Sequence, residues 1–170
     1  MILLRCLAAG ALSFVPLAAQ SSFTTFGATC SQGLQLSAVG SPHLGQPFFV
    51  GYSGAIGSQF VGQYDILSQP VLLLGLSNTQ AGSAPLPAVL PLGWTLDASC
   101  VLLVSPDAMV PIPLPATPPF GLTLPIPATP SFAGATFHLQ WLQVQIRSTF
   151  GQFVWLRLAS SNGGTAVVGP

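Results

Sequence analysis

Few side chains in this sequence have the chemistry of a catalyst. The chain holds three Asp, three Arg and two His, with no Lys and no Glu. The best nucleophile candidate is Ser53, because GYSGA at 51–55 fits a loose version of the turn that presents a catalytic serine in hydrolases. That turn leads into a helix, whereas 56–62 contains two Gly and does not have a helical pattern. We therefore expect Ser53 to be an ordinary strand residue.

The histidines and carboxylates are too scattered to form a catalytic or metal site. His43 lies in the turn-like SPHLG, and His138 lies in an alternating, strand-like run. The Asp residues are far apart in sequence, so they do not form an acid and base pair or a calcium loop. A zinc site would need more ligands than the histidines and a pair of cysteines offer. We expect no catalytic residue, no metal site and no cofactor, and we expect the Asp side chains to cap turns or to pair with Arg147 and Arg157.

The residues best suited to binding lie in the last predicted hairpin, where STFGQ at 148–152 supplies the turn. A turn centred near Phe150 pairs residue 147 with 153, 145 with 155 and 143 with 157. One face of this hairpin is then apolar and is expected to be core: Leu142, Val144, Ile146, Val154, Leu156 and Leu158. On the other face the residues predicted to bind a ligand or partner are Gln143, Gln145, Phe153, Trp155 and Arg157. Aromatic rings beside amides and guanidinium groups suit sugar stacking or protein contact, and the alternative is a solvated face with an Arg stacked over Trp155.

The elements that position these residues are predicted to be β-strands. No segment combines helical spacing of apolar residues with capping residues, and Gly and Pro recur throughout the chain. Apolar or alternating runs bounded by turn residues cover 48–53, 71–76, 100–105, 136–147, 153–160 and 165–168. Phe137, Leu139 and Trp141 have the opposite phase to Leu142, so we expect a bulge near Trp141 and Leu142 that keeps both sets inside. The predicted fold class is all-β, an antiparallel β-sandwich or a jelly-roll-like arrangement.

A proline-rich stretch at 111–134 nearly repeats itself, since PATPPFG at 115–121 returns as PATPSFA at 127–133. Pro lacks the N–H that a central strand donates, so we expect this stretch at sheet edges or in covering segments. A linker would be poor in large apolar residues, whereas the copies end in Phe120 and Phe132. Burial of these rings would favour packing of the stretch onto the folded body.

The N-terminus has the layout of a secretory signal peptide. Residues 1–5 carry one positive charge, and 6–19 is an apolar run that ends in small residues. This run is shorter than the roughly 20 residues that span a bilayer. We therefore predict a signal helix at 1–20, cleaved after Ala19 or Gln20, and a single secreted domain at 21–170 that has no membrane span. The alternative is an uncleaved anchor helix.

After cleavage the chain is nearly free of charge. The six charged side chains less Arg5 leave five, and they form no basic patch, so nucleic-acid binding is not expected. Little charge repulsion opposes self-association or packing into a matrix. Export to an oxidising compartment favours a disulfide between the remaining cysteines, Cys30 and Cys100, which closes a loop of about 70 residues. The alternative is two free buried thiols.

Several short motifs occur in an order that resembles a known family. They are CSQGLQL, GSPHLGQPF, LLLGLS, PLPAVLPLGWTLDASCVLLVSPD, LPIPATPSFAGATFHLQWL and SNGGTAVVG. Together they cover nearly all of the mature chain and resemble the uncharacterised secreted domain that recurs in planctomycete and similar bacterial extracellular proteins. The resemblance implies secretion, a β-rich module and a bridge between the cysteines that map onto Cys30 and Cys100. The Gly that the family has before each Cys is replaced here by Thr29 and Ser99, and no activity is implied.

These features predict a non-enzymatic module that is secreted or held at the cell surface. The first interpretation is a structural or interaction module of the cell envelope or of an extracellular assembly. The second is a carbohydrate-binding module, and a secreted hydrolase is a distant third. The expected partner is an extracellular protein or a polysaccharide, and self-association is expected to be easy because so few charges oppose it.

Overall fold

The computed structural model describes residues 20–30, 34–54, 59–61, 64–91, 95, 99–112, 120–149 and 152–170. At 59–61, 64–67, 147–149 and 152–156 it describes the path of the strands but not the side chains. The predicted signal peptide, apart from Gln20, lies outside these residues. The described part of the chain is all-β, with antiparallel sheets and no α-helix, which confirms the predicted fold class at that level.

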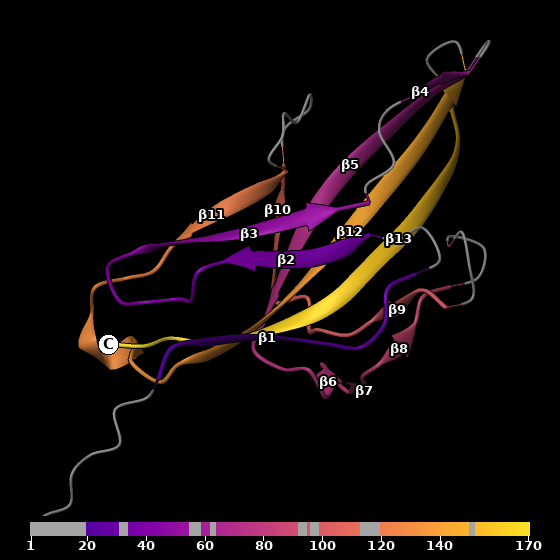
Figure 1. Ribbon diagram of the computed structural model, residues 1–170. Coiled ribbons are helices and arrows are strands. Elements are labelled where there is room, and N and C mark those ends of the chain that lie inside the picture. The colour runs from indigo at the N-terminus through magenta and orange to yellow at the C-terminus, as the bar shows by residue number, and fades with distance from the viewer. Residues whose placement is uncertain are drawn as a thin grey trace, which may run out of the picture.

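The large sheet is built around a long hairpin near the C-terminal end of the chain (Figure 1). Among the described residues it has six strands, in the order β1-β13-β12-β5-β10 with β4 beside β5. Their bounds are β1 Ser22–Phe26, β4 Gln59–Val61, β5 Tyr64–Gly75, β10 Ala108–Pro111, β12 Thr136–Thr149 and β13 Gln152–Val167. The predicted runs at 153–160 and 165–168 are therefore parts of one strand.

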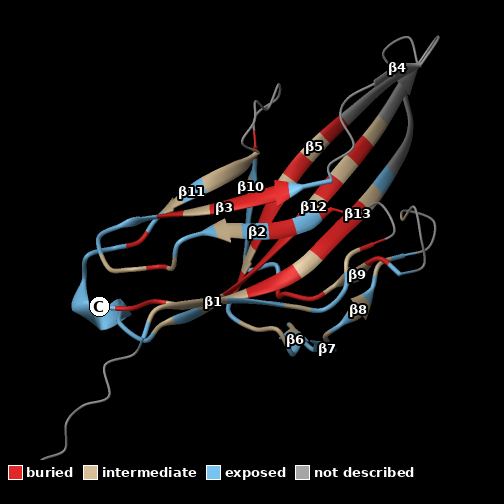
Figure 2. Cartoon of the chain, in the orientation of Figure 1, coloured by how far each residue is buried: buried red, intermediate tan, exposed pale blue. Residues whose placement is uncertain are grey.

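The small sheet packs against the large one and completes the core. Its strands lie in the order β11-β3-β2, with bounds β2 Gln35–Val39, β3 Pro47–Ser53 and β11 Gly121–Pro125. Both sheets contribute to one cluster of buried residues: Leu34, Leu36, Phe48, Val50, Tyr52, Leu72, Ile112, Ile126, Leu139, Trp141, Ala166 and Val168. Trp141 joins the sheets, because its indole Nε1 donates to the Gly51 carbonyl at 3.0 Å and its ring lies 4.9 Å from that of Tyr52. Figure 2 shows the buried positions concentrated along β3, β5, β12 and β13.

A long excursion between β5 and β10 covers the opposite face of the large sheet. It contains the short strands β6 (Gln80–Ala81), β7 (Ala84–Pro85), β8 (Ala88–Val89) and β9 (Val101–Leu102). Leu73 follows the core residue Leu72 in β5, so its side chain points to the opposite face of the sheet. It is fully buried there, because residues of the excursion cover it. The predicted strand at 100–105 is correct only at Val101–Leu102, since the rest of that run packs on the large sheet without strand pairing.

The described strands of the proline-rich stretch lie at sheet edges, as expected, whereas 113–119, with most of the first PATPPFG copy, lie outside the described residues. β10 ends at Pro111 on the edge of the large sheet, and β11 ends at Pro125 on the edge of the small sheet. Phe120 is half-buried and stacks on Tyr52 at a centroid distance of 5.4 Å. Phe132 instead ends a 3₁₀ turn, Pro130–Phe132, and is 45% exposed, so the prediction that it is buried is wrong.

The predicted bulge near Trp141 is present, but the extra residue belongs to the partner strand. Gln140 pairs with Gly163 and Leu142 pairs with Ser160, so two residues of β13, at 161 and 162, oppose Trp141. Trp141 N–H donates to Ser161 Oγ at 2.9 Å, which satisfies a backbone donor at the irregularity. The bulge therefore changes the phase of β13 and leaves that of β12 unchanged.

The faces of the long hairpin are consequently the reverse of the prediction. Against β5, β12 keeps an unbroken register, so Gln143 and Gln145 lie on the same strand face as Trp141. The exposed fractions of these Gln side chains are 1% and 4%. Four side chains predicted to be core are only half-buried: Leu142, Val144, Ile146 and Leu158. The side chains of Val154 and Leu156 lie outside the described residues.

The register of this hairpin also differs from the prediction. Residue 147 pairs with 155, 145 with 157 and 143 with 159, which is two positions beyond the expected partners. Thr149 pairs with Gln152, so the connection is shorter than a turn centred on Phe150, and a second irregularity follows Arg147. A shift of two residues preserves the strand face, so it does not cause the reversal of burial.

Candidate functional site

The residues predicted to bind a partner do not form one open face. Gln143 and Gln145 are buried, whereas Arg157, which pairs with Gln145 across the ladder, is exposed. Phe153 pairs with Ser148 rather than with Arg147, and its side chain and that of Trp155 lie outside the described residues. The buried amides cannot contact a partner unless the fold opens, so Arg157 is the one predicted contact that the described side chains leave at the surface.

His43 precedes β3 and Ser53 ends it, so the structure does not bring these two side chains together. Ser53 is the exposed last residue of β3, and 55–58 after it lie outside the described residues. The His43 ring lies in a turn, as expected, with Nε2 at 2.8 Å from Ser21 Oγ and Nδ1 at 3.2 Å from the Pro170 carbonyl. These contacts join the first described residues to the last. The contacts are with the hydroxyls of Ser21 and Ser41 and with a main-chain oxygen of Pro170, and none is with a described Asp side chain of the kind that orients a catalytic histidine.

His138 is a satisfied buried histidine of β12. Its Nδ1 lies 3.0 Å from Thr165 Oγ1, and its ring meets the ring of Phe26 edge to face at 6.2 Å. Burial lowers the pKa of His138, because the charged imidazolium loses contact with water. The ring therefore packs inside the fold between Thr165 and Phe26.

Asp107 joins two distant parts of the chain, rather than capping a local turn or pairing with an Arg as expected from the sequence. Its Oδ2 accepts hydrogen bonds from Leu76 N–H and from Ser105 Oγ, each at 2.7 Å. The pKa of Asp107 is lowered by the hydrogen bond from Leu76 and then by that from Ser105. Asp65 and Asp97 have no described side chain. In the part of the chain that the structure describes, no three His, Cys, Asp or Glu side chains gather as they would around a metal ion.

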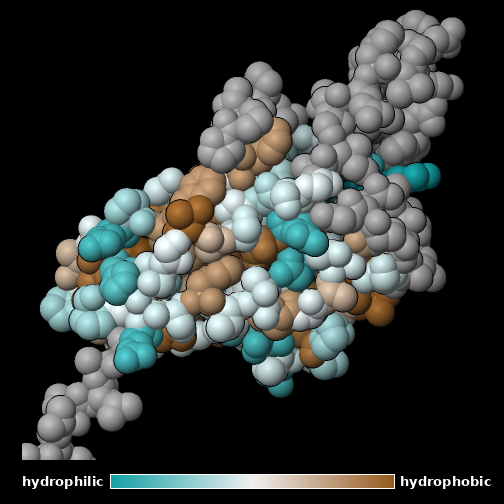
Figure 3. Space-filling model, viewed as in Figure 1, coloured by the Kyte–Doolittle hydropathy of each residue, from teal (hydrophilic) through white to brown (hydrophobic). Residues whose placement is uncertain are grey.

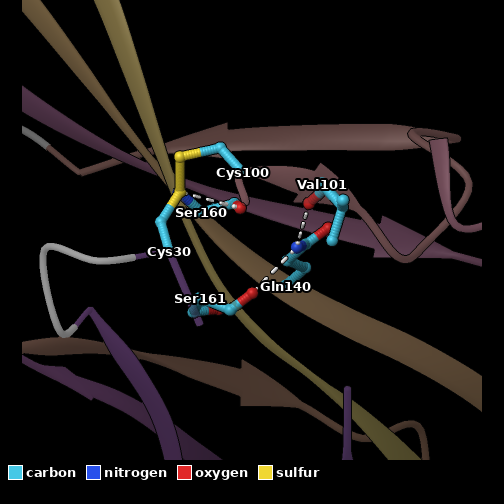
Figure 4. Close-up of a disulfide and its surroundings, with 6 residues drawn as sticks. All are labelled: Cys30, Cys100, Val101, Gln140, Ser160 and Ser161. Carbon is cyan, nitrogen blue, oxygen red and sulfur yellow. Dashed lines mark hydrogen bonds between the residues drawn. A yellow bond between two sulfur atoms is a disulfide. The ribbon is translucent and has the colours of Figure 1, made fainter. Parts of the chain in front are cut away.

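The predicted disulfide between Cys30 and Cys100 is confirmed (Figure 4). The Cα atoms are 4.7 Å apart and both residues are buried. Cys30 is also held to β13, because its N–H donates to the Ser160 carbonyl at 2.9 Å and Ser160 N–H donates to Cys30 Sγ at 3.1 Å. The bridge therefore attaches the excursion that contains Cys100 to the large sheet at Ser160 of β13. Disulfides of this kind are typical of proteins in oxidising compartments.

A buried amide beside the disulfide, which was not predicted, fixes the same excursion. Gln140 has no exposed surface. Its Oε1 accepts from Leu103 N–H, and its Nε2 donates to the carbonyls of Val101 and Ser161, each at 2.9 Å (Figure 4). A single side chain thus joins the excursion, β12 and the bulge of β13. A Gln in an alternating strand has the pattern of a surface residue, which is why the sequence did not reveal this role.

An uncharged polar pocket of about 340 Å³ lies where β1 ends and β2 begins. Its lining residues are Thr25, Gly27, Thr29, Gln35, Leu36 and Asn162. Asn162 sits at the bulge of β13, and its Oδ1 accepts from Leu36 N–H at 2.8 Å. This hydrogen bond satisfies an N–H on the edge strand of the small sheet. The sequence analysis missed these residues, which come together only through long-range pairing.

An apolar groove of about 300 Å³ lies at the opposite end of β2 and β3, where β11, the 3₁₀ turn and the start of β12 meet. Its lining residues are Leu74, Leu76, Leu124, Pro125, Ile126, Pro127, Phe132, Ala135, Thr136, Phe137 and Val168. Leu76 is 79% exposed and Phe132 is 45% exposed. Water therefore contacts large apolar side chains at the rim of an apolar hollow.

No protein family model, curated protein or solved structure matches this chain. The resemblance to the secreted planctomycete domain therefore stays a prediction, and the chain's function must be argued from its own residues. No helix among the described residues has the length and apolar character needed to cross a bilayer.

Proposed function

We propose that this protein is a secreted, non-enzymatic interaction module of the cell envelope or of an extracellular assembly, with the two sheets packed as a β-sandwich. The observation that carries the proposal is the apolar groove with Leu76 and Phe132 at its rim. The disulfide supports an extracellular location, because such bridges persist in oxidising compartments. The proposed occupant of the groove is an apolar side chain of another extracellular protein.

The chemistry of the groove favours association with a protein surface. Apart from Thr136, its lining residues are apolar. Burial of a Leu side chain such as Leu76 contributes about 1.5 to 3 kcal/mol, which corresponds to roughly a tenfold to hundredfold change in affinity. The near absence of formal charge means that little repulsion opposes close approach. On the face in view in Figure 3, apolar residues occur as separate patches among pale and teal ones.

Leu76→Ser tests this function. We expect wild-type protein to co-sediment with envelope material from the producing cells, and we expect the variant to be retained at least tenfold less. Met109→Ser is the matched control, since Met109 is 65% exposed and does not line the groove. Equal retention of both variants and the wild type would exclude the groove as the contact. Analytical ultracentrifugation of the same proteins shows whether the partner is a second copy.

A second candidate function is carbohydrate binding, and the polar pocket beside Asn162 favours it. Hydroxyl and amide groups without charge match the hydrogen-bonding groups of a neutral sugar. The test is retention on insoluble polysaccharides such as cellulose, chitin or starch. A protein that stays in the supernatant with all of them does not bind carbohydrate as proposed.

A further inference from the structure

We propose that the polar pocket formed by β1, the 27–30 segment, β2 and Asn162 binds a short neutral saccharide through uncharged hydrogen-bonding groups. This inference rests on the second candidate function, carbohydrate binding, and it gives that function a site different from the Phe153 and Trp155 face predicted from sequence. A volume of about 340 Å³ lies at the lower end of the range of small-molecule sites, about 300 to 1,000 Å³. A saccharide end fits this size better than the middle of a long chain.

The donors and acceptors of the pocket suit hydroxyl groups. Thr25 and Thr29 each offer a hydroxyl that both donates and accepts, and Gln35 offers an amide. Asn162 Oδ1 accepts a hydrogen bond from Leu36 N–H, which leaves the Nδ2 amide of Asn162 to donate to a ligand. No lining residue carries a charge, so the pocket has nothing to balance a phosphate, a carboxylate or an ammonium group. Neutral polyols satisfy these groups without burying an unpaired charge.

The walls of the pocket are held in place before a ligand arrives. Gly27 has a φ of 70°, and a Cβ at this position would lie 2.7 Å from Leu103 Cδ1, so this wall packs directly on the excursion. The disulfide and the Cys30 N–H to Ser160 carbonyl bond fix the other end of the same wall. A bulge of β13 directs Asn162, and bulges commonly re-aim side chains next to binding sites. Preorganised groups lose little conformational entropy on binding, which favours a specific site over a chance hollow.

The experiment titrates ¹⁵N-labelled protein with the neutral disaccharides maltose, cellobiose and lactose and follows the backbone amide shifts. We expect millimolar binding, because the contacts are uncharged hydrogen bonds without a stacking ring among the lining residues. The shifts should centre on Thr25, Gln35, Leu36 and Asn162. Thr25→Val combined with Gln35→Met should weaken binding about tenfold or more, since each change replaces a hydrogen-bonding side chain with an apolar one of similar shape.

Thr24→Val is the matched control. Thr24 is exposed on β1 beside Thr25 but does not line the pocket, so this variant should bind like the wild type. Equal loss in Thr24→Val and in the pocket variant would overturn the inference, and thermal unfolding of all variants verifies that they are folded. If the wild type and the pocket variant are retained equally on a polysaccharide, the protein binds carbohydrate but not through this pocket. If neither a disaccharide nor a polysaccharide binds, the site and the second candidate function are both wrong, while the test of the apolar groove is unaffected.

Discussion

Two single polar side chains, Gln140, which is buried, and Asp107, which is exposed, determine how the irregular part of this protein is attached. Gln140 makes all its hydrogen bonds to backbone groups, and two of its three partners belong to the excursion between β5 and β10. Asp107 similarly holds Leu76 and Ser105 at the two ends of that excursion. Residues that look like solvated positions in the sequence therefore replace the ladder hydrogen bonds that this segment lacks.

Gln140→Leu is expected to lower the free energy of unfolding by about 3 kcal/mol or more. The change keeps the volume but leaves the buried N–H of Leu103 and the carbonyls of Val101 and Ser161 without their partner, at about 1 to 3 kcal/mol for each unsatisfied group. Urea unfolding of the variant measures the effect. Gln80→Leu, at an exposed position of β6, is the control and should stay within about 0.5 kcal/mol of the wild type. A similar result for both variants would mean that the Gln140 amide is not needed to hold the excursion.

His138 gives stability a pH dependence whose sign follows from burial. Its pKa is lowered in the folded protein, whereas the unfolded chain takes up this proton near pH 6.5. Between these two pKa values the unfolded state binds more protons than the folded state. The stability that is present above about pH 6.5 is therefore lost as the pH falls toward the pKa of the folded protein. We expect His138→Gln, which can still hydrogen-bond Thr165, to show a smaller loss of unfolding free energy between pH 7.5 and pH 5.5. An unchanged pH dependence in this variant would assign the effect to other groups.

At the scale of elements, the bulge of β13 decides which residues of the long hairpin are buried. The extra residue reverses the direction of the side chains in β13, while β12 keeps an unbroken alternation against β5. Gln143 and Gln145 of β12 therefore point into the core, on the same face as Trp141. The glycines that follow the bulge allow β1 to pack closely on β13. A Cβ at Gly164 would lie 2.6 Å from ring atom Cζ of Phe23 and 2.6 Å from Leu36 Cδ2.

Gly164→Ala is expected to destabilise the protein by about 1 to 3 kcal/mol, because the added methyl group overpacks the space between β1 and β2. Thermal or urea unfolding measures the loss. A second variant, Gly164→Ala with Phe23→Leu, should lose less stability than the sum of the two single changes, since the shorter side chain frees the space near the new methyl group. If the double variant is less stable than the sum of the single changes, the clash with Phe23 is not the cause.

The sequence predicted the kind of element better than its phase. Alternating apolar runs identified β3, β5 and β12 as strands, and the missing N–H of proline identified the edge positions of β10 and β11. Periodicity also required a bulge near Trp141, but it could not tell which strand carries the extra residue, because that depends on pairing with a distant strand. The same limit hid both pockets. Asn162 approaches Leu36, and Leu76 approaches Phe132, only through contacts between segments far apart in the chain.

At the scale of the whole molecule, two sheets and an irregular excursion share one body that a disulfide crosslinks. The residues joined are 70 positions apart, and the chain between them includes β2 to β8. The bridge connects β13, at Ser160, to the end of the excursion, beside the contacts of Gln140. It therefore constrains a segment that has few strand pairs of its own.

Removing the disulfide is expected to lower the free energy of unfolding by roughly 4 kcal/mol, as the chain-entropy relation gives for a loop of this length. The double variant Cys30→Ala with Cys100→Ala, compared with oxidised wild type in urea, measures this loss. The free energy of unfolding of wild-type protein kept under reducing conditions should approach that of the variant. A loss well below 1 kcal/mol would show that the unfolded chain is already restricted in the region that the bridge closes.

The crosslinked excursion also bears on survival among extracellular proteases. An enzyme that cuts after Lys or Arg finds no such residue from position 6 to position 146, a span that contains the two cysteines of the disulfide. An enzyme of other specificity could cut the exposed backbone around Gly82 and Pro87, which lies between Cys30 and Cys100. The two fragments would stay covalently joined, and β5 and β12 would still be paired. A nick in this part of the chain would therefore leave the protein in one piece, which is consistent with the proposed extracellular location.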